Sequence, residues 1–70
     1  KAILEFCMEE KRSRIEIFGF LGMANNTINN SRHLLPLIER EFIKMTEPDN
    51  LRSKNQRYYT TELGEIQIYL

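Results

Sequence analysis

The most constraining feature of this sequence is a pair of β-prone segments that flank a turn signal. Residues 42–46, FIKMT, alternate apolar and polar side chains, and residues 57–61, RYYTT, are rich in tyrosine and threonine. The segment between them begins with Pro48, Asp49 and Asn50, which are residue types typical of turns. This order predicts a strand, a turn and a second strand that pair as a β-hairpin.

Two helices are predicted before the hairpin. Apolar residues recur at helical spacing within residues 1–10, which favours a first helix there. Ser13 is followed three residues later by Glu16, which is a capping-box signature. Gly22 suits the left-handed conformation that ends many helices. These signals predict a second helix over residues 14–21.

The second helix is expected to place Ile17, Phe20 and Leu21 against the core, because these residues form its apolar stripe. Ile15 and Phe18 fall off this stripe and are expected on the surface. An exposed apolar pair of this kind indicates a surface for a partner.

One kinked helix is predicted over residues 26–40, with Asn25 or Asn26 as its cap. Pro36 interrupts this segment because it cannot donate a hydrogen bond to the carbonyl of Arg32. An apolar stripe nevertheless crosses the proline, which favours one helix over two. Its members are Ile28, Leu35, Ile38 and Phe42.

Residues 62–70 favour either a short last helix capped by Thr61 or an extended end. The whole order predicts a mostly α fold with a small β-hairpin, in the α+β class. It is that of a winged helix-turn-helix: three helices, a hairpin wing and a short C-terminal segment. Residues 1–70 suffice for a single domain, and the start at Lys1 without methionine suggests a fragment of a larger protein.

The charges are unevenly distributed on a chain whose formal net charge is zero. No acidic residue occurs in residues 17–38 or in residues 50–61. The basic residues of these two windows are Arg32, Arg52, Lys54 and Arg57. The remaining segments hold six basic and ten acidic residues, so the windows carry +4 and the remainder −4. If the windows meet in the fold, they form a local positive surface.

Several classes of function are not expected from this composition. Cys7 is the single cysteine, which suggests a reducing, cytoplasmic location and is best read as a small buried hydrophobe. His33 has no second ligand to form a metal site, and no cofactor is expected. No apolar run approaches the roughly 18 residues that a membrane span needs, so no membrane partner is expected.

The sequence also resembles a known family. The matching segments are RSRIEIFGFLGM, HLLPLIEREFIKMTEPD and a Ser-x-x-Gln-x-Tyr pattern formed by Ser53, Gln56 and Tyr58. They resemble the winged-helix domain at the C-terminus of Fic-like proteins, and the C-terminal module of divergent AAA-type ATP-binding regulators. Winged helices commonly carry a glycine where this chain has Glu41, and the relatives are more basic across the third helix. The Fic catalytic run, His-Pro-Phe leading to Gly-Asn-Gly-Arg, is absent, so the resemblance implies an accessory domain and no enzyme.

The expected function is DNA binding within a transcriptional regulator or Fic-like protein. The third helix would enter the major groove of double-stranded DNA, and the wing would contact the phosphate backbone. The candidate contact residues are Arg12, Asn26, Asn29, Asn30, Arg32, His33, Arg52, Lys54, Gln56 and Arg57.

Two of these candidates have a second interpretation. Gln56 can bond a base edge or the backbone of its own hairpin, and Arg32 can pair with a phosphate or with Glu39. The asparagines and His33 are expected on the side of the third helix opposite Ile28 and Leu35.

The alternative function is that of a protein–protein interaction or dimerisation module that does not bind DNA. It would use Ile15, Phe18 and the C-terminal segment, either in a homodimer or against another domain of a parent protein.

Overall fold

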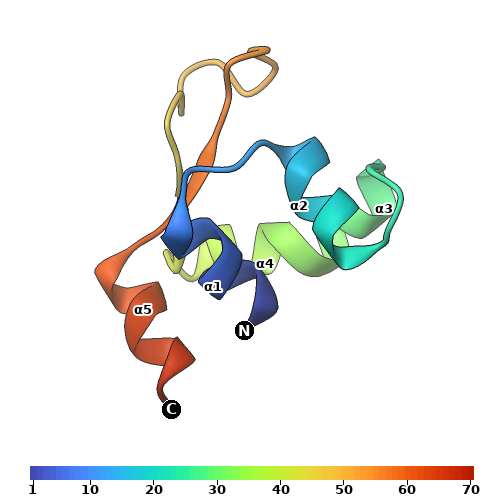
Figure 1. The fold of residues 1–70 in the computed structure, drawn as a ribbon. Coiled ribbons are helices and arrows are strands. Elements are labelled where there is room, and N and C mark those ends of the chain that lie inside the picture. The colour runs from blue at the N-terminus through green and yellow to red at the C-terminus, as the bar shows by residue number, and fades with distance from the viewer.

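The structure is a computed structural model that describes residues 1–70. Helices cover most of the chain, and one two-stranded hairpin projects from them as a wing (Figure 1). This arrangement confirms the predicted α+β class and is winged-helix-like. The elements are α1 (Ala2–Glu9), α2 (Arg14–Leu21), α3 (Thr27–Asn29), η1 (Asn30–Leu34), α4 (Leu35–Glu39), β1 (Ile43–Met45), β2 (Tyr58–Thr60) and α5 (Glu62–Ile68). Every helix falls short of the length and apolar character that crossing a bilayer requires.

The wing is anchored to the helices by a third, one-residue strand. β1 and β2 pair antiparallel, with Met45 opposite Tyr58. Arg12, in the connection between α1 and α2, pairs with Tyr58 through backbone N–H···O=C bonds of 2.7 and 3.0 Å. Tyr58 is therefore bonded on one edge to the α1–α2 connection while its strand pairs with β1 on the other.

α2 begins and ends where the sequence predicts. The Ser13 hydroxyl accepts a hydrogen bond from the Glu16 N–H at 3.1 Å, and the Glu16 carboxylate accepts one from the Ser13 N–H at 2.9 Å. These two bonds form the expected capping box. The hydrogen bond that the Ser13 N–H donates to the Glu16 carboxylate is the largest of the causes that lower the pKa of this carboxyl. Gly22 ends the helix in the left-handed conformation, at φ 70°.

The predicted core face of α2 is partly wrong. Ile17 is fully buried as expected, but so is Phe18, which was expected on the surface. Phe20, which was expected in the core, is 54% exposed and stacks on the Phe6 ring with centroids 4.2 Å apart. The physical reason is that this short helix carries apolar residues on every side, so periodicity does not select which of them faces the core.

The third helix is continuous from α3 through η1 to α4, but it contains a five-residue π turn. The Leu35 N–H donates to the carbonyl of Asn30, five residues earlier, directly before Pro36. Leu34 becomes the fully buried residue of this helix. Ile28 is 67% exposed and Leu35 41% exposed, so their predicted place in the core is wrong. The wider turn changes the helical phase on which that prediction depended.

Glu41 occupies the position where winged helices commonly have glycine. Its φ of 62° lies in the left-handed region, and it is the only non-glycine residue with a positive φ. The Thr61 hydroxyl donates to the Glu41 carbonyl at 2.6 Å, which ties this turn to the cap of α5. A side chain in this conformation is strained, by about 1–2 kcal/mol in the left-handed helical region.

Replacing Glu41 with glycine is therefore expected to raise the free energy of unfolding by up to about 1 kcal/mol, since relief of strain exceeds the added entropy of the unfolded chain. Urea unfolding followed by circular dichroism measures the change. The neighbouring Arg40→Gly is the matched control, because Arg40 has φ −85° and gains nothing from glycine. A loss of stability in Glu41→Gly equal to that in Arg40→Gly would contradict the assigned conformation.

α5 packs against the hairpin through Gly64. A Cβ atom on Gly64 would overlap the backbone carbonyl oxygen of Phe42. Because that oxygen accepts the Thr61 N–H at 3.0 Å, it cannot move without breaking the end of the sheet. Only glycine allows this approach of α5 to the residue that precedes β1.

Gly64→Ala is expected to destabilise the protein by about 1–3 kcal/mol despite the higher helix propensity of alanine. Gly19→Ala is the matched control, because Gly19 is also helical but has no atom within 4 Å of the added Cβ. The control is expected to stabilise by up to about 1 kcal/mol. Thermal unfolding compares the two variants, and equal shifts in Tm would show that α5 does not pack closely on Phe42.

Candidate nucleic-acid interface

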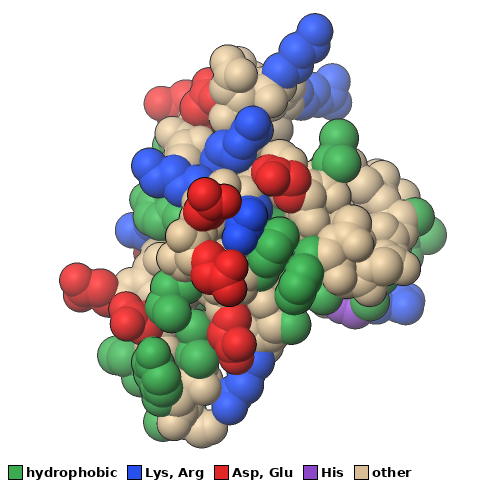
Figure 2. All heavy atoms as spheres, in the orientation of Figure 1, with side chains coloured by type: hydrophobic (Ala, Val, Ile, Leu, Met, Phe, Trp, Pro, Cys, Tyr) green, Lys and Arg blue, Asp and Glu red, His purple; other side chains and the backbone are tan.

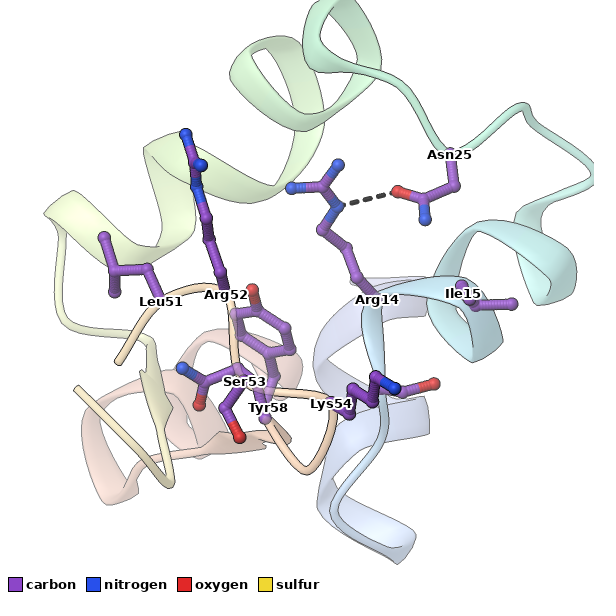
Figure 3. Close-up of a pocket in the computed structure, with 10 residues that line it drawn as sticks. Arg14, Ile15, Asn25, Leu51, Arg52, Ser53, Lys54 and Tyr58 are labelled. Carbon is purple, nitrogen blue, oxygen red and sulfur yellow. Dashed lines mark hydrogen bonds between the residues drawn. The ribbon is translucent and has the colours of Figure 1, made fainter. Parts of the chain in front are cut away.

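A groove of about 290 Å³ lies between the start of α2 and the wing. Three of its ten lining residues are basic, namely Arg14, Arg52 and Lys54, and none is acidic. Arg14 and Arg52 extend in the same direction from the two walls, with Tyr58 between them (Figure 3). The groove is therefore lined by hydrogen-bond donors of positive charge and by no carboxylate, which suits an anion.

Arg14 is held in place by the loop that follows α2. Its Nε donates to the Asn25 side-chain oxygen at 2.6 Å, which leaves the two terminal nitrogens directed away from this bond (Figure 3). Arg14 is not among the residues that the sequence predicted to contact DNA. The capping-box signature could have indicated that Arg14 is free of Glu16. It predicts that the Glu16 carboxylate accepts a hydrogen bond from the Ser13 N–H instead of pairing with Arg14.

The buried side chain of Gln56 forms hydrogen bonds with the backbone of the wing loop. Only 6% of the residue is exposed, and its side-chain oxygen accepts from the Glu47 N–H at 2.9 Å. Its amide group donates to the carbonyls of Glu47 at 2.6 Å and Asn50 at 3.1 Å. Of the two interpretations left open for Gln56, bonding to the backbone of its own hairpin is the one that the structure has.

The residues of the Ser-x-x-Gln-x-Tyr pattern thus stabilise the wing loop of this chain. The Ser53 hydroxyl donates to the Glu47 carboxylate at 3.1 Å and accepts from the Asn55 N–H at 3.1 Å. Gln56 satisfies the loop backbone, and Tyr58 is 6% exposed in the core. Together these residues fix the wing loop that carries Arg52 and Lys54.

Gln56→Leu keeps the approximate volume but leaves the Glu47 and Asn50 backbone groups without their partner. We expect a loss of about 1–3 kcal/mol in the free energy of unfolding, because buried polar groups without hydrogen bonds are costly. The matched control is Gln67→Leu in α5, which changes the same residue type outside the wing. Chemical denaturation compares both variants, and equal stability would exclude the structural role of Gln56.

Arg12 is used within the protein. Its guanidinium lies 3.8 Å from the centre of the Phe6 ring and pairs with Glu9 at 3.2 Å and Glu10 at 3.1 Å. Its Nε also donates to the Phe6 carbonyl at 3.0 Å. Because Phe20 stacks on the same ring, Phe6 lies between an arginine and a phenylalanine. The charge of Arg12 is neutralised, so it is a structural residue.

The asparagines of the third helix secure its start. The Asn26 side chain accepts from the Asn29 N–H at 2.8 Å, which confirms Asn26 as the cap. The Asn29 side chain donates to the Ala24 carbonyl at 2.8 Å. Asn30 and His33 are half-buried. Of the expected outer face, Asn26 is exposed and Asn29 is half-buried like Asn30 and His33, whereas Ile28 and Leu35, which were placed opposite them, are exposed.

The remaining basic candidates divide between two places. Arg32 lines a separate shallow hollow with Thr27, Ile28 and Ser31, and it makes no ion pair with Glu39. Arg57 donates to the Gln56 carbonyl at 3.1 Å along the wing itself. The two acid-free windows therefore meet only in part, where Asn25 lines the same groove as Arg52 and Lys54.

Cys7 is 2% exposed within the core, as expected. Burial raises the pKa of its thiol to about 11, an effect that exceeds the opposing influence of Arg12. A thiol protonated at neutral pH and shielded from solvent is a poor nucleophile.

Helices, hairpin and groove together define a small winged-helix-like α+β domain. The profile of the family described as "Filamentation induced by cAMP protein Fic-like, C-terminal domain" matches residues 1–61. The chain belongs to this family, as its sequence resemblance suggested. It is also similar to a Fic family protein from Desulfovibrio desulfuricans G20, with a TM-score of 0.72 and 31% sequence identity. That match covers 87% of this chain but 19% of the other chain, and no curated protein gives a significant match.

Proposed function

We propose that this Fic-like C-terminal domain binds double-stranded DNA as part of a larger transcriptional regulator or Fic-like protein. The third helix would enter the major groove, and the wing would lie on the phosphate backbone. The observation that carries the proposal is the groove with three basic and no acidic lining residues. The ion pairs of the structure all belong to Arg12, so these three cations are not neutralised within the protein.

The groove suits phosphate better than it suits a base. Arginine offers paired N–H donors to phosphate oxygens, and Arg14 is already oriented by Asn25. Arg52 and Lys54 approach from the wing, whose loop is fixed by Gln56. Contacts of this type position a protein on DNA without reading its sequence.

The three groove cations are expected to contribute about three phosphate contacts, so the slope of log affinity against log salt should be about −2.7 from these contacts. Replacing Arg14, Arg52 and Lys54 together with glutamine should remove this part of the slope, and each single replacement about 0.9 of it. Fluorescence anisotropy of a labelled duplex at several salt concentrations measures the slope.

Arg40→Gln is the matched control for these variants, because Arg40 is exposed but lies outside the groove. Its effect on the slope should be clearly smaller than that of any groove replacement. Retention of the full slope in the triple variant would contradict the role of the groove. Absence of binding at low salt would contradict DNA binding itself.

The interaction module remains the second candidate because α5 exposes an apolar stripe. On α5, Leu63 is 46% exposed and Ile66 55%; Leu70, beyond the end of α5, is 79% exposed, and Ile15 on α2 is 71% exposed. Phe18 no longer contributes, since it is buried. Self-association in sedimentation equilibrium that Ile66→Ser weakens, in a protein that binds no duplex at low salt, would favour this function over DNA binding.

A further inference from the structure

The exposed face at the start of the third helix has an apolar centre and a polar rim. Thr27, Ile28, Ser31 and Arg32 line a shallow hollow of about 430 Å³. Ile28 projects from this face with 67% of its surface exposed, and none of its neighbours is acidic. An exposed isoleucine in the first turn of a helix has no role in the core of this small protein.

The fold itself turns Ile28 outward. Asn26 caps the helix start and orients its first turn, and the π turn brings Leu34 into the core instead. Residues 17–38 contain no acidic side chain, so this face does not repel a polyanion. The face therefore combines a methyl-rich centre with two hydroxyl groups and one guanidinium.

The edge of thymine in the major groove has matching chemistry. It presents a C5-methyl group beside an oxygen acceptor, and neighbouring guanines present two further acceptors. In helix-turn-helix proteins, the N-terminal residues of the recognition helix are the ones that contact base edges. Apolar side chains discriminate thymine through its methyl group, whereas phosphate contacts carry no sequence information.

On this basis we infer that Ile28 is a specificity-determining residue that contacts the C5-methyl group of a thymine, with Arg32 donating to acceptors beside it. The inference rests on the proposed DNA binding but concerns a different surface from the basic groove. It assigns positioning to the groove and sequence discrimination to the exposed turn of the third helix.

The test removes the methyl group from DNA and its partner from the protein. The full chain selects its preferred duplexes from a random library, and each thymine of the best duplex is then replaced singly with deoxyuridine, which pairs with adenine but lacks the methyl group. At one or two positions, affinity should fall about fourfold, the value for one buried methyl-sized group. Ile28→Ala should bind the thymine and deoxyuridine duplexes equally, since it has lost the contact.

Ile66→Ala is the matched control, because Ile66 is 55% exposed but belongs to α5. This variant should retain the fourfold discrimination of the unmodified protein. Circular dichroism of both variants checks that they remain folded.

The outcomes separate this inference from the proposed function. Salt-dependent binding with equal affinity for thymine and deoxyuridine duplexes at every position would overturn the role of Ile28 but leave DNA binding standing. Discrimination that survives in Ile28→Ala would also overturn it. If no duplex binds at low salt, both proposals fail, and self-association lost in Ile28→Ala would then assign this face to a protein partner.

Discussion

The face that the third helix presents depends on one constraint, the missing N–H of Pro36. A regular α-helix would require that group to bond the carbonyl of Arg32, and the proline ring would collide with the same carbonyl. The helix widens by one residue instead, so that the Leu35 N–H reaches back to Asn30. This π turn keeps the helix continuous, buries Leu34 and leaves Ile28 and Leu35 facing solvent. A kink that broke the helix would have separated its start from the α4 turn that packs against β1.

The wing depends on hydrogen bonds from a small number of polar groups, chiefly the backbone of Arg12 and the side-chain amide of Gln56. A two-stranded hairpin alone is marginally stable in water. Here Tyr58 bonds the backbone of Arg12 on its free edge, while the side chain of Arg12 covers Phe6. The loop beyond the strands has no ladder of its own, and the amide of Gln56 supplies bonds to Glu47 and Asn50 in its place. The basic residues of the wing are thus carried by a loop with defined internal hydrogen bonds.

Local features of the fold could be predicted from the sequence because they depend on neighbouring residues. The capping box at Ser13, the left-handed Gly22 and the cap of α5 at Thr61 all belong to this class. The helix faces could not be predicted in the same way. α2 is apolar on all sides, and the π turn alters the phase of the third helix.

Features that depend on tertiary contact were beyond the sequence altogether. The close approach of Gly64 to Phe42 requires knowledge of where α5 lies against the hairpin. In the candidate site, too, some residues could be predicted from the sequence and others depend on tertiary contacts. Arg52 and Lys54 could be identified from an acid-free window, but Arg14 joins them only because the fold engages Glu16 in a cap and Asn25 in a bond.

A net charge of zero is compatible with a positive site because the charges of this protein are separated in space. At the wing end of the molecule, basic side chains project on one side and acidic side chains on the other, and further acidic side chains lie over its middle (Figure 2). The wing and α5, which carries Glu62 and Glu65, lie at opposite ends of a molecule whose longest extent is 30 Å. At physiological ionic strength the Debye length is about 8 Å, so acids at that distance barely reduce the potential at the groove. Glu16 and Glu47 keep their negative charges, but their carboxylates are held by hydrogen bonds from the Ser13 N–H and the Ser53 hydroxyl and do not line the groove. An anion at the groove therefore meets three lining cations, Arg14, Arg52 and Lys54, although the protein as a whole has a formal net charge of zero.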